Sequence, residues 1–497
     1  MKRLDQLTFI RFGMVILIVF FHGYGGIYTG WMLKIPFFDS LLGTATTAVG
    51  FMYVLSGFVM SLVYHKSEEK FEIANYWKAR FVRIYPLYIF AFLLTCLYYF
   101  DAFISVKPQK ILANIFAVHA WIPAYAQSFN YPAWSITVEI FFYLIFPFLT
   151  IWSYRISTKK LIWGSMIFWA ISQLIYHIVW IGWFDTQRQF VLYFPLIHLN
   201  SFVVGVVGGI WYVREGRLVA HNPVHNRFLL GLSIIFSLGY LILGMRYVPS
   251  LPHGLQPMAG ILAPIMLLFI MTLSLDNTRL SKYLQLPWLV TLGESSYAIY
   301  ILHVPISWLF EKYLAEFNIP NAIWVFSVFN VPLIVLFSVG LYMFFDTPLR
   351  NWMREYFKTI DIRLLLLDFA IFIPVTFFIF QIRFDEREYR LLYREMERVV
   401  FWVGFFSRPL LLMTFGSYRL SNLFSEHYKW QMPVVASFSI STLLMMAVAY
   451  WGYVTGWFEN FPRSVFVLDW VIITAFSLII RFTLCKLGIY KQEAVPA

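Results

Sequence analysis

Residues 7–28 read LTFIRFGMVILIVFFHGYGGIY, an apolar stretch in which Arg11 and His22 are the only basic side chains and no acidic one occurs. A helix of this length rises about 33 Å, close to the roughly 30 Å thickness of the hydrocarbon core of a bilayer. The stretch therefore predicts a membrane-spanning helix. No small-residue cleavage site follows it, so we interpret it as a retained first helix rather than a cleaved signal peptide.

Similar runs recur along the whole chain of 497 residues, of which 60% are hydrophobic and 13% charged. Soluble domains carry about 25% charged residues, so the composition predicts an integral membrane protein. The runs lack the alternation of a membrane β-barrel, which favours an all-α bundle. Ten runs in the first part of the chain are long enough to span: 7–28, 41–64, 79–100, 133–152, 161–181, 190–213, 228–245, 258–274, 289–311 and 321–345. The run 111–122 is too short to span and predicts a re-entrant or interfacial segment.

The net charge of +12 lies largely in short loops between these runs. Positively charged loops tend to stay in the cytoplasm, and their distribution predicts that both termini are cytoplasmic. Membrane topology therefore explains the positive charge, and no nucleic-acid partner is predicted. Cys96 and Cys485 lie in or beside apolar runs and indicate neither a disulfide framework nor a metal site.

Ionisable residues inside membrane spans are costly and often functional. Arg11 and His22 are eleven residues apart, which places them on one helical face about 16 Å apart along the axis. Each has an alternative explanation. Arg11 could be an interfacial arginine that reaches the headgroups, and His22 could be a hydrogen-bonded structural histidine.

Counting residues from the predicted membrane faces places Glu139 and His303 near the depth of His22, toward the outer side. The same counting places Ser56 and Gly57 near the cytoplasmic side, with Arg80 and Arg83 at the inner mouth. A glutamate beside two histidines is suited to proton transfer, and arginines suit a phosphorylated donor. No Gly-rich phosphate loop or Gly-x-Ser-x-Gly elbow is present, so the nucleophile is expected to be the acceptor's own hydroxyl, or His22 transiently.

These positions resemble the bacterial membrane acyltransferase type 3 family over about residues 1–350. The matching motifs are Arg3-Leu4-Asp5 through Arg11 to His22, Phe51 to Phe58, Arg80 to Tyr88, Pro132 to Tyr143, Leu292 to Pro305, and Asp346 to Arg350. The family usually has Glu where Asp346 stands. Members often carry a soluble esterase-like domain after the bundle, which this sequence lacks, so transfer is expected to be direct or to need a separate partner.

The resemblance implies an acyl-CoA donor, commonly acetyl-CoA, no permanently bound cofactor, and a glycan or lipid-linked sugar acceptor at the bacterial inner membrane. It implies a catalytic set of His22, Glu139 and His303. A second set would bind the donor: Arg11, Ser56, Gly57, Arg80 and Arg83. A third would support the site: Trp134, Ser135, Tyr143, Ser296 and Tyr297.

Four more apolar runs follow a polar stretch, near 364–384, 399–415, 433–456 and 463–484. We therefore predict an acyltransferase domain over 1–350, a linker over 351–363, a four-helix transmembrane module over 364–484 and a cytoplasmic tail over 485–497. Asp368, Arg383-Phe384, Phe415 to Arg419, Phe461 to Ser464 and Arg481 resemble the membrane anchor of nucleotide-sugar dehydratases and epimerases of polysaccharide biosynthesis. The module is expected to dock other glycan-assembly proteins. Against its simple topology, loop 381–398 would face outward with five arginines: Arg383, Arg387, Arg390, Arg394 and Arg398.

Two other functions compete with this prediction. A proton-coupled transporter or flippase could use His22, Glu139 and His303 as a relay. A scaffold that only recruits other enzymes would leave the buried ionisable residues unexplained. The basic inner mouth on the same face as His22 favours the O-acyltransferase.

Overall fold

The computed structural model describes residues 4–24, 45–65, 71–98, 108–182, 191–216, 231–232, 259–276, 278–317, 325–385, 392–424, 429–456 and 458–488. Every regular element among them is helical. Ten of the described helices are long and apolar enough to cross a membrane. The prediction of an all-α, multi-pass membrane protein is confirmed. Contacts divide the chain into two units, Met1–Arg350 and Asn351–Ala497.

In the first unit, seven of these candidate spans are Asp5–Gly23, Thr47–Tyr64, Ile73–Tyr98, Tyr131–Ser153, Thr158–Trp180, Pro195–Gly216 and Phe326–Lys358, the last of which runs past the unit's boundary. The predicted span 228–245 lies almost wholly outside the described residues. The run 258–274 forms only the 13-residue helix α13 (Ala263–Leu275). The segment around 111–122 contains α6 (Pro108–Ile115) and short 3-10 turns, which confirms that it does not span.

The predicted span 289–311 is broken into α15 (Pro287–Glu294) and α16 (Ser296–Glu316). The break falls at Ser295, whose hydroxyl donates to the carbonyl of Leu292 at 2.9 Å. Gly293 sits just before it against the backbone of the first helix, where an added Cβ would lie 2.1 Å from the carbonyl oxygen of Thr8. The break therefore follows from local bonding and close helix packing, which hydropathy does not report.

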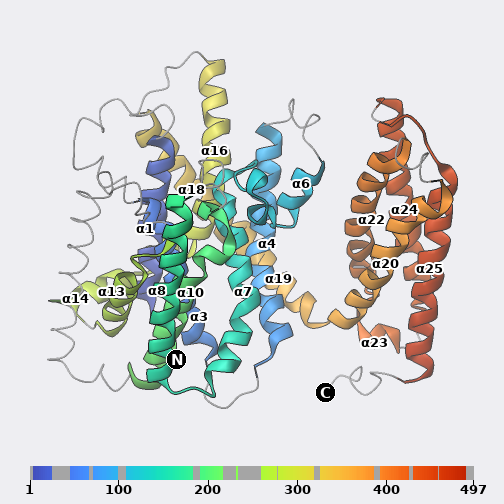
Figure 1. Cartoon of the computed structure of the whole chain (residues 1–497). Helices are drawn as coiled ribbons and strands as arrows, with labels where there is room; N and C mark the ends of the chain where they lie inside the picture. Colours follow the sequence, from blue (N-terminus) through green and yellow to red (C-terminus); the bar gives the residue numbers. More distant parts are fainter. Residues whose placement is uncertain are drawn as a thin grey trace. The chain divides into compact units, whose positions relative to one another are not determined.

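The helices that carry the site are α1 (Asp5–Tyr24), α3 (Ala45–Tyr64), α4 (Ile73–Tyr98), α7 (Trp134–Ser153), α15 and α16. Helix α3 packs along α10 (Leu199–Trp211), and α1 packs on α3, α15 and α16 (Figure 1). The α3–α10 contact is built on glycine. A Cβ on Gly57 would lie 2.3 Å from the carbonyl oxygen of Phe202, and one on Gly205 would lie 2.0 Å from that of Val54. Small residues let membrane helices approach this closely.

Three site helices, α4, α7 and α16, contain an internal proline, which leaves the carbonyl four residues earlier without its helical donor. In α7, Pro147 frees the carbonyl of Tyr143, and the indole of Trp77 on α4 donates to it at 3.2 Å. In α16, Pro305 frees the carbonyl of Ile301, and the Asn130 amide donates to it at 2.7 Å. In α7 and α16, side chains from other segments thus satisfy the freed carbonyls and fix these two helices near the site.

The remaining helices of the first unit are α8 (Thr158–Gly182), α14 (Arg279–Leu284) and α18 (Val331–Leu341). A π-turn, η9 (Tyr342–Asp346), leads from α18 into α19 (Thr347–Lys358). Residues 351–358 of the predicted linker are therefore helical. The expected change of composition at 351 coincides with the division between the two units, whereas the function assigned to each part stays a prediction.

The four long helices of the second unit form a ring: α20 (Ile362–Arg383), α22 (Arg394–Thr414), α24 (Gln431–Val454) and α25 (Arg463–Lys486). Each packs against two of the others, α20 on α22, α22 on α24, α24 on α25 and α25 on α20 (Figure 1). Arg387 and Arg390 of the arginine-rich loop lie outside the described residues, as does the end of the predicted tail from 489.

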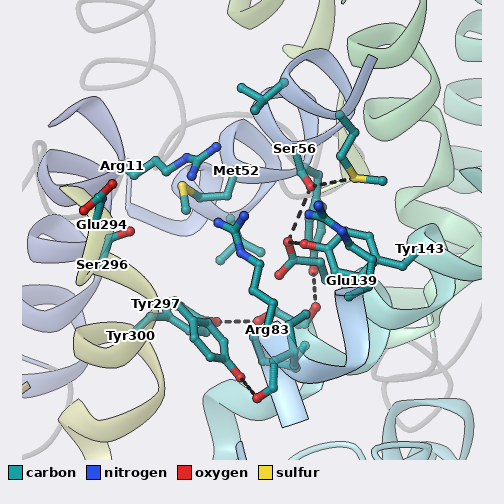
Figure 2. A pocket seen from close by; sticks show the side chains of 18 of the residues that line it. Arg11, Met52, Ser56, Arg83, Glu139, Tyr143, Glu294, Ser296, Tyr297 and Tyr300 are labelled. Atoms are coloured by element: carbon teal, nitrogen blue, oxygen red, sulfur yellow. Dashed lines mark hydrogen bonds between the residues drawn. The ribbon is translucent and has the colours of Figure 1, made fainter. Parts of the chain in front are cut away.

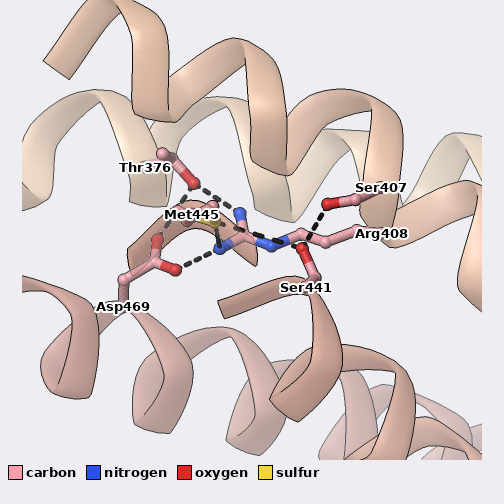
Figure 3. A network of polar contacts seen from close by, with 6 residues as sticks. All are labelled: Thr376, Ser407, Arg408, Ser441, Met445 and Asp469. Carbon is pink, nitrogen blue, oxygen red and sulfur yellow. Dashed lines mark hydrogen bonds and ion pairs between the residues drawn. The ribbon is translucent and has the colours of Figure 1, made fainter. Parts of the chain in front are cut away.

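Two ion pairs are buried inside this ring. Arg408 pairs with Asp469, and Thr376 donates to the same carboxylate at 3.0 Å (Figure 3). Arg481 binds Asp368 through two bonds of 2.8 and 2.7 Å. All four charged residues are at most 2% exposed. Pairing and added hydrogen bonds are what allow charges to remain inside a membrane bundle.

Candidate active site

A cavity of about 110 Å³ lies within the first unit. Six helices supply its walls, α1, α3, α4, α7, α15 and α16, and many of its lining side chains are polar (Figure 2). Nine of the thirteen residues predicted for the site line it: Arg11, Ser56, Arg80, Arg83, Ser135, Glu139, Tyr143, Ser296 and Tyr297. The cavity therefore gathers residues that are up to 289 positions apart in the sequence, from Arg11 to Tyr300.

Three arginines give the cavity its positive charge, and they differ in how they are held. Arg83 extends into the middle of the cavity, and Arg11 enters it from α1 (Figure 2). Arg80 is enclosed by the rings of Tyr64, Tyr76 and Tyr143, whose centroids lie 5.1, 5.6 and 5.5 Å from its guanidinium carbon. It also donates to the hydroxyl of Tyr64 at 2.6 Å. Aromatic faces stabilise a guanidinium without neutralising it.

Two glutamates face these cations. Glu139 accepts hydrogen bonds from Tyr143 at 2.5 Å and from Ser56 at 3.4 Å. Glu294 accepts one from Tyr342 at 2.9 Å. With three arginines and two glutamates ionised, the lining carries a formal charge of 3 − 2 = +1. The cavity is thus suited to an anionic or strongly polarised ligand.

The contact between Ser56 and Glu139 corrects the sequence-based depth estimate, which placed the two residues toward opposite faces of the membrane. Counting along straight, untilted helices caused that error, because tilt shifts the depth of each residue. Glu139 lies with the arginines. The described contacts of His22 are with other partners, so the predicted cluster of His22, Glu139 and His303 is only partly assembled.

His22 and His303 form a direct pair. His22 Nδ1 and His303 Nε2 are 2.7 Å apart, and the two rings are within 5° of parallel. The ring of Tyr131 packs against His22 with centroids 4.9 Å apart. The pair lies one helical turn beyond the cavity lining, because Ile18 and Tyr300 line it and precede His22 and His303 by four and three residues.

Tyr300 and Ser135 line the cavity, and Tyr300 also contacts this histidine pair. The hydroxyl of Tyr300 is 2.7 Å from that of Ser135 and donates to the carbonyl of Pro132 at 3.0 Å. The Tyr300 ring is also 5.9 Å from the ring of His303, centroid to centroid. This bonded pair of hydroxyls is therefore the part of the lining next to the histidines.

Two predicted site residues have packing roles instead. Gly57, expected to bind the donor, faces the backbone of α10 and does not line the cavity. Trp134 packs its ring on Tyr193 and His198, at 5.1 and 5.3 Å between centroids, and supports α7 from behind. Tyr297 lines the cavity and also donates to the carbonyl of Ile84 at 2.9 Å, which joins α16 to α4.

The sequence interpretation missed Glu294 and Tyr300. Glu294 is an acidic residue at the start of an apolar run, so the rule that selected Glu139 would also have selected it. Tyr300 gave no comparable signal, because tyrosine is frequent in this sequence and one more in an apolar helix is unremarked.

Comparison with known proteins bears on the first unit. A family model described as an acyltransferase domain matches residues 4–343. The chain belongs to the acyltransferase type 3 family. The predicted resemblance is thereby confirmed, and the match includes every helix that lines the cavity and both histidines.

Within this acyltransferase family, similar relatives are distant in sequence. Acyltransferase MdmB of Streptomyces mycarofaciens is 25% identical over 297 residues, which cover 54% of this chain and 71% of the relative. O-acetyltransferase OatA of Staphylococcus aureus (strain NCTC 8325 / PS 47) is 23% identical over 321 residues, or 60% of this chain. The match spans about half the length of OatA, 51%. No solved structure matches the chain. The resemblance of the second unit to a dehydratase anchor stays a prediction.

Proposed function

We propose that this acyltransferase moves a short acyl group, with acetyl as the first candidate, from acyl-CoA to a hydroxyl of an envelope glycan or glycolipid. One observation carries the proposal. An arginine-lined cavity ends one helical turn from a hydrogen-bonded histidine pair. A donor thioester and a base for the acceptor can therefore meet in one place. The family match favours this enzyme over the transporter considered from the sequence.

The dimensions and charge of the cavity support a thioester donor with a small acyl group. Its volume of about 110 Å³ holds several waters, since one water needs about 10–15 Å³. A thin pantetheine arm with a short acyl end matches that space better than a nucleotide does. The phosphates of the donor would then bind at the cationic mouth, where Arg83 and Arg11 supply charge-assisted hydrogen bonds.

The chemistry requires one proton transfer and one displacement. His22 would accept the proton of the acceptor hydroxyl, whose oxygen attacks the acyl carbonyl carbon. The carbon–sulfur bond then breaks, and the protonated His22 returns the proton to the departing CoA thiolate. Glu139 would balance the charge of the arginines and hold Ser56 and Tyr143 in place.

The site also suggests an orientation. A cytoplasmic donor requires the arginine mouth to open inward, which agrees with the predicted cytoplasmic N-terminus and with a bacterial inner membrane location. We assign the second unit a docking role toward other glycan-assembly proteins. Its buried ion pairs give it an interior of its own, as a separate module would need.

The test is His22→Ala, with His177→Ala on α8 as the matched control. We expect glycan O-acylation to fall by about 10²- to 10⁴-fold in cells that express His22→Ala. The control should retain activity. Both variants should insert in the membrane, and purified His22→Ala should bind acetyl-CoA as the wild type does. Normal acylation by His22→Ala, measured by mass spectrometry of the surface glycan, would remove the catalytic role.

A further inference from the structure

The hydrogen bonds of His303 determine which of its nitrogens carries a proton. Its Nδ1 lies 2.5 Å from the carbonyl oxygen of Tyr300. A carbonyl oxygen has no proton to give, so Nδ1 must be the donor. A neutral imidazole has only one N–H, and His303 is 2% exposed with no carboxylate among its described contacts to balance a charge. Its Nε2 therefore carries a lone pair.

The protonation of His303 determines which nitrogen of His22 carries the proton. His303 Nε2 can only accept, so His22 Nδ1 must donate across the 2.7 Å that separates them. The rings are nearly parallel with centroids 5.0 Å apart, and nitrogens as close as 2.7 Å require the rings to lie edge to edge. This is the in-plane geometry that a nitrogen lone pair prefers. The lone pair of His22 is then on Nε2. Among the described residues, none hydrogen-bonds to that atom.

The surroundings of His303 hold the ring in this position. The Ile301 carbonyl, freed by Pro305, is bonded by Asn130, which ties α16 to the segment before α7. The residue before Ile301 is Tyr300, and its hydroxyl donates to the carbonyl of Pro132. Two adjacent residues in the turn that precedes His303 are therefore fixed by contacts outside α16.

We infer that His303 is a positioning residue that fixes the tautomer of His22, so that His22 Nε2 is the base of the reaction. The inference rests on the proposed acyl transfer. The acceptor proton goes to Nε2, which makes His22 an imidazolium whose Nδ1–H still donates to His303. The same proton then leaves from Nε2 to the thiolate of the donor. His303 keeps one proton throughout and does not contact the reacting atoms.

The first test compares His303→Gln with His303→Met. The glutamine side-chain oxygen can accept the hydrogen bond from His22, whereas methionine offers only a weak acceptor of similar length. We expect kcat to fall about 10²-fold or more in His303→Met and to stay within about 10-fold of wild type in His303→Gln. Acetyl-CoA affinity should be unchanged in both. Equal loss in both variants, or a loss of donor binding that accounts for the decrease, would overturn the positioning role.

The second test reads the tautomer without activity. Selective ¹⁵N labelling of histidine in purified, membrane-reconstituted protein reports which nitrogen is protonated, and His22→Asn identifies the signal of His22. We expect the Nδ1–H form of His22 in the wild type and in His303→Gln, and loss of that form in His303→Met. An Nε2–H form in the wild type would refute the inference even if acylation proceeds. Absence of acylation by wild-type protein with the Nδ1–H form present would instead refute the proposed function.

Discussion

At the scale of single residues, Arg80 and Arg83 show how two similar side chains acquire different surroundings. They are three positions apart on α4, and both line the cavity. Arg80 is bonded to Tyr64 and enclosed by three aromatic rings. Arg83 extends into the cavity (Figure 2). Arg80 therefore contributes to packing as well as charge, and Arg83 is the better placed of the two to bind a phosphate.

We expect Arg83→Met to weaken acetyl-CoA binding by about 10- to 100-fold, because one charge-assisted hydrogen bond contributes about 1.5–3 kcal/mol. Its thermal stability should stay near that of wild type. Arg80→Met should lower both, because its cation–π contacts are lost. Isothermal titration and thermal unfolding of purified protein measure the two effects. Arg279→Met, on an exposed position of α14, is the control. Unchanged affinity in Arg83→Met would mean that Arg83 serves topology alone.

Residue-scale prediction from the sequence worked where a polar side chain stood out in an apolar run. Arg11 and Glu139 were recognisable on that ground, and both line the cavity. The pairing of His22 with His303 also followed from depth along the helix axis. What sequence could not supply was the direction of each side chain around its helix. Gly57 therefore received a binding role although it faces α10.

At the scale of helices, the α3–α10 contact depends on two glycines, which have no Cβ atom. Gly57 and Gly205 bring two backbones so close that a methyl group on either would collide with a carbonyl oxygen of the other helix. Backbone atoms cannot rotate away as a flexible side chain can. The contact holds α3 in the position that presents Ser56 to Glu139.

We expect Gly57→Ala to destabilise the protein by about 1–3 kcal/mol, the usual effect of overpacking a tight contact. Gly50→Ala is the matched control on the same helix, because a Cβ there meets nothing within 4 Å. Alanine is the better helix former, so the control should be neutral or slightly stabilising. Thermal unfolding followed by size-exclusion chromatography compares the two. Equal stability would show that the helices separate at little cost.

Helix existence was easier to predict than helix continuity. Apolar length identified most of the described spans, because a bilayer imposes a minimum length on any helix that crosses it. It did not identify the break at Ser295 or the helical continuation to Lys358. The break depends on a serine hydroxyl and a glycine contact with α1, which are tertiary features.

At the scale of the whole molecule, the chain has two units, each with its own interior. Five charged residues of the first unit line a cavity, whereas four charged residues of the second unit are buried as two ion pairs. Asp368 and Arg481 were noted in the sequence, but their pairing required α20 and α25 to be adjacent. Arg408 and Asp469 lie on α22 and α25 and were not singled out (Figure 3).

We expect Arg408→Met to destabilise the second unit by about 3–5 kcal/mol, because it leaves Asp469 buried and unpaired. The double variant Arg408→Met/Asp469→Leu should recover much of this loss. Acetyl-CoA binding by the first unit should be unchanged in both. Limited proteolysis after Arg350 and titration with acetyl-CoA separate the two effects. Weaker donor binding in the single variant would show that the units are energetically coupled.

The prolines of α7 and α16 have a consequence for how this protein can evolve. While Pro305 remains, loss of Asn130 strands the carbonyl of Ile301 in an apolar interior. If Pro305 is replaced first, the helix supplies its own donor and Asn130 becomes dispensable. The same order applies to Pro147 and Trp77. In each pair, the proline can therefore be replaced first and its partner second, whereas the reverse order leaves a buried carbonyl without a donor.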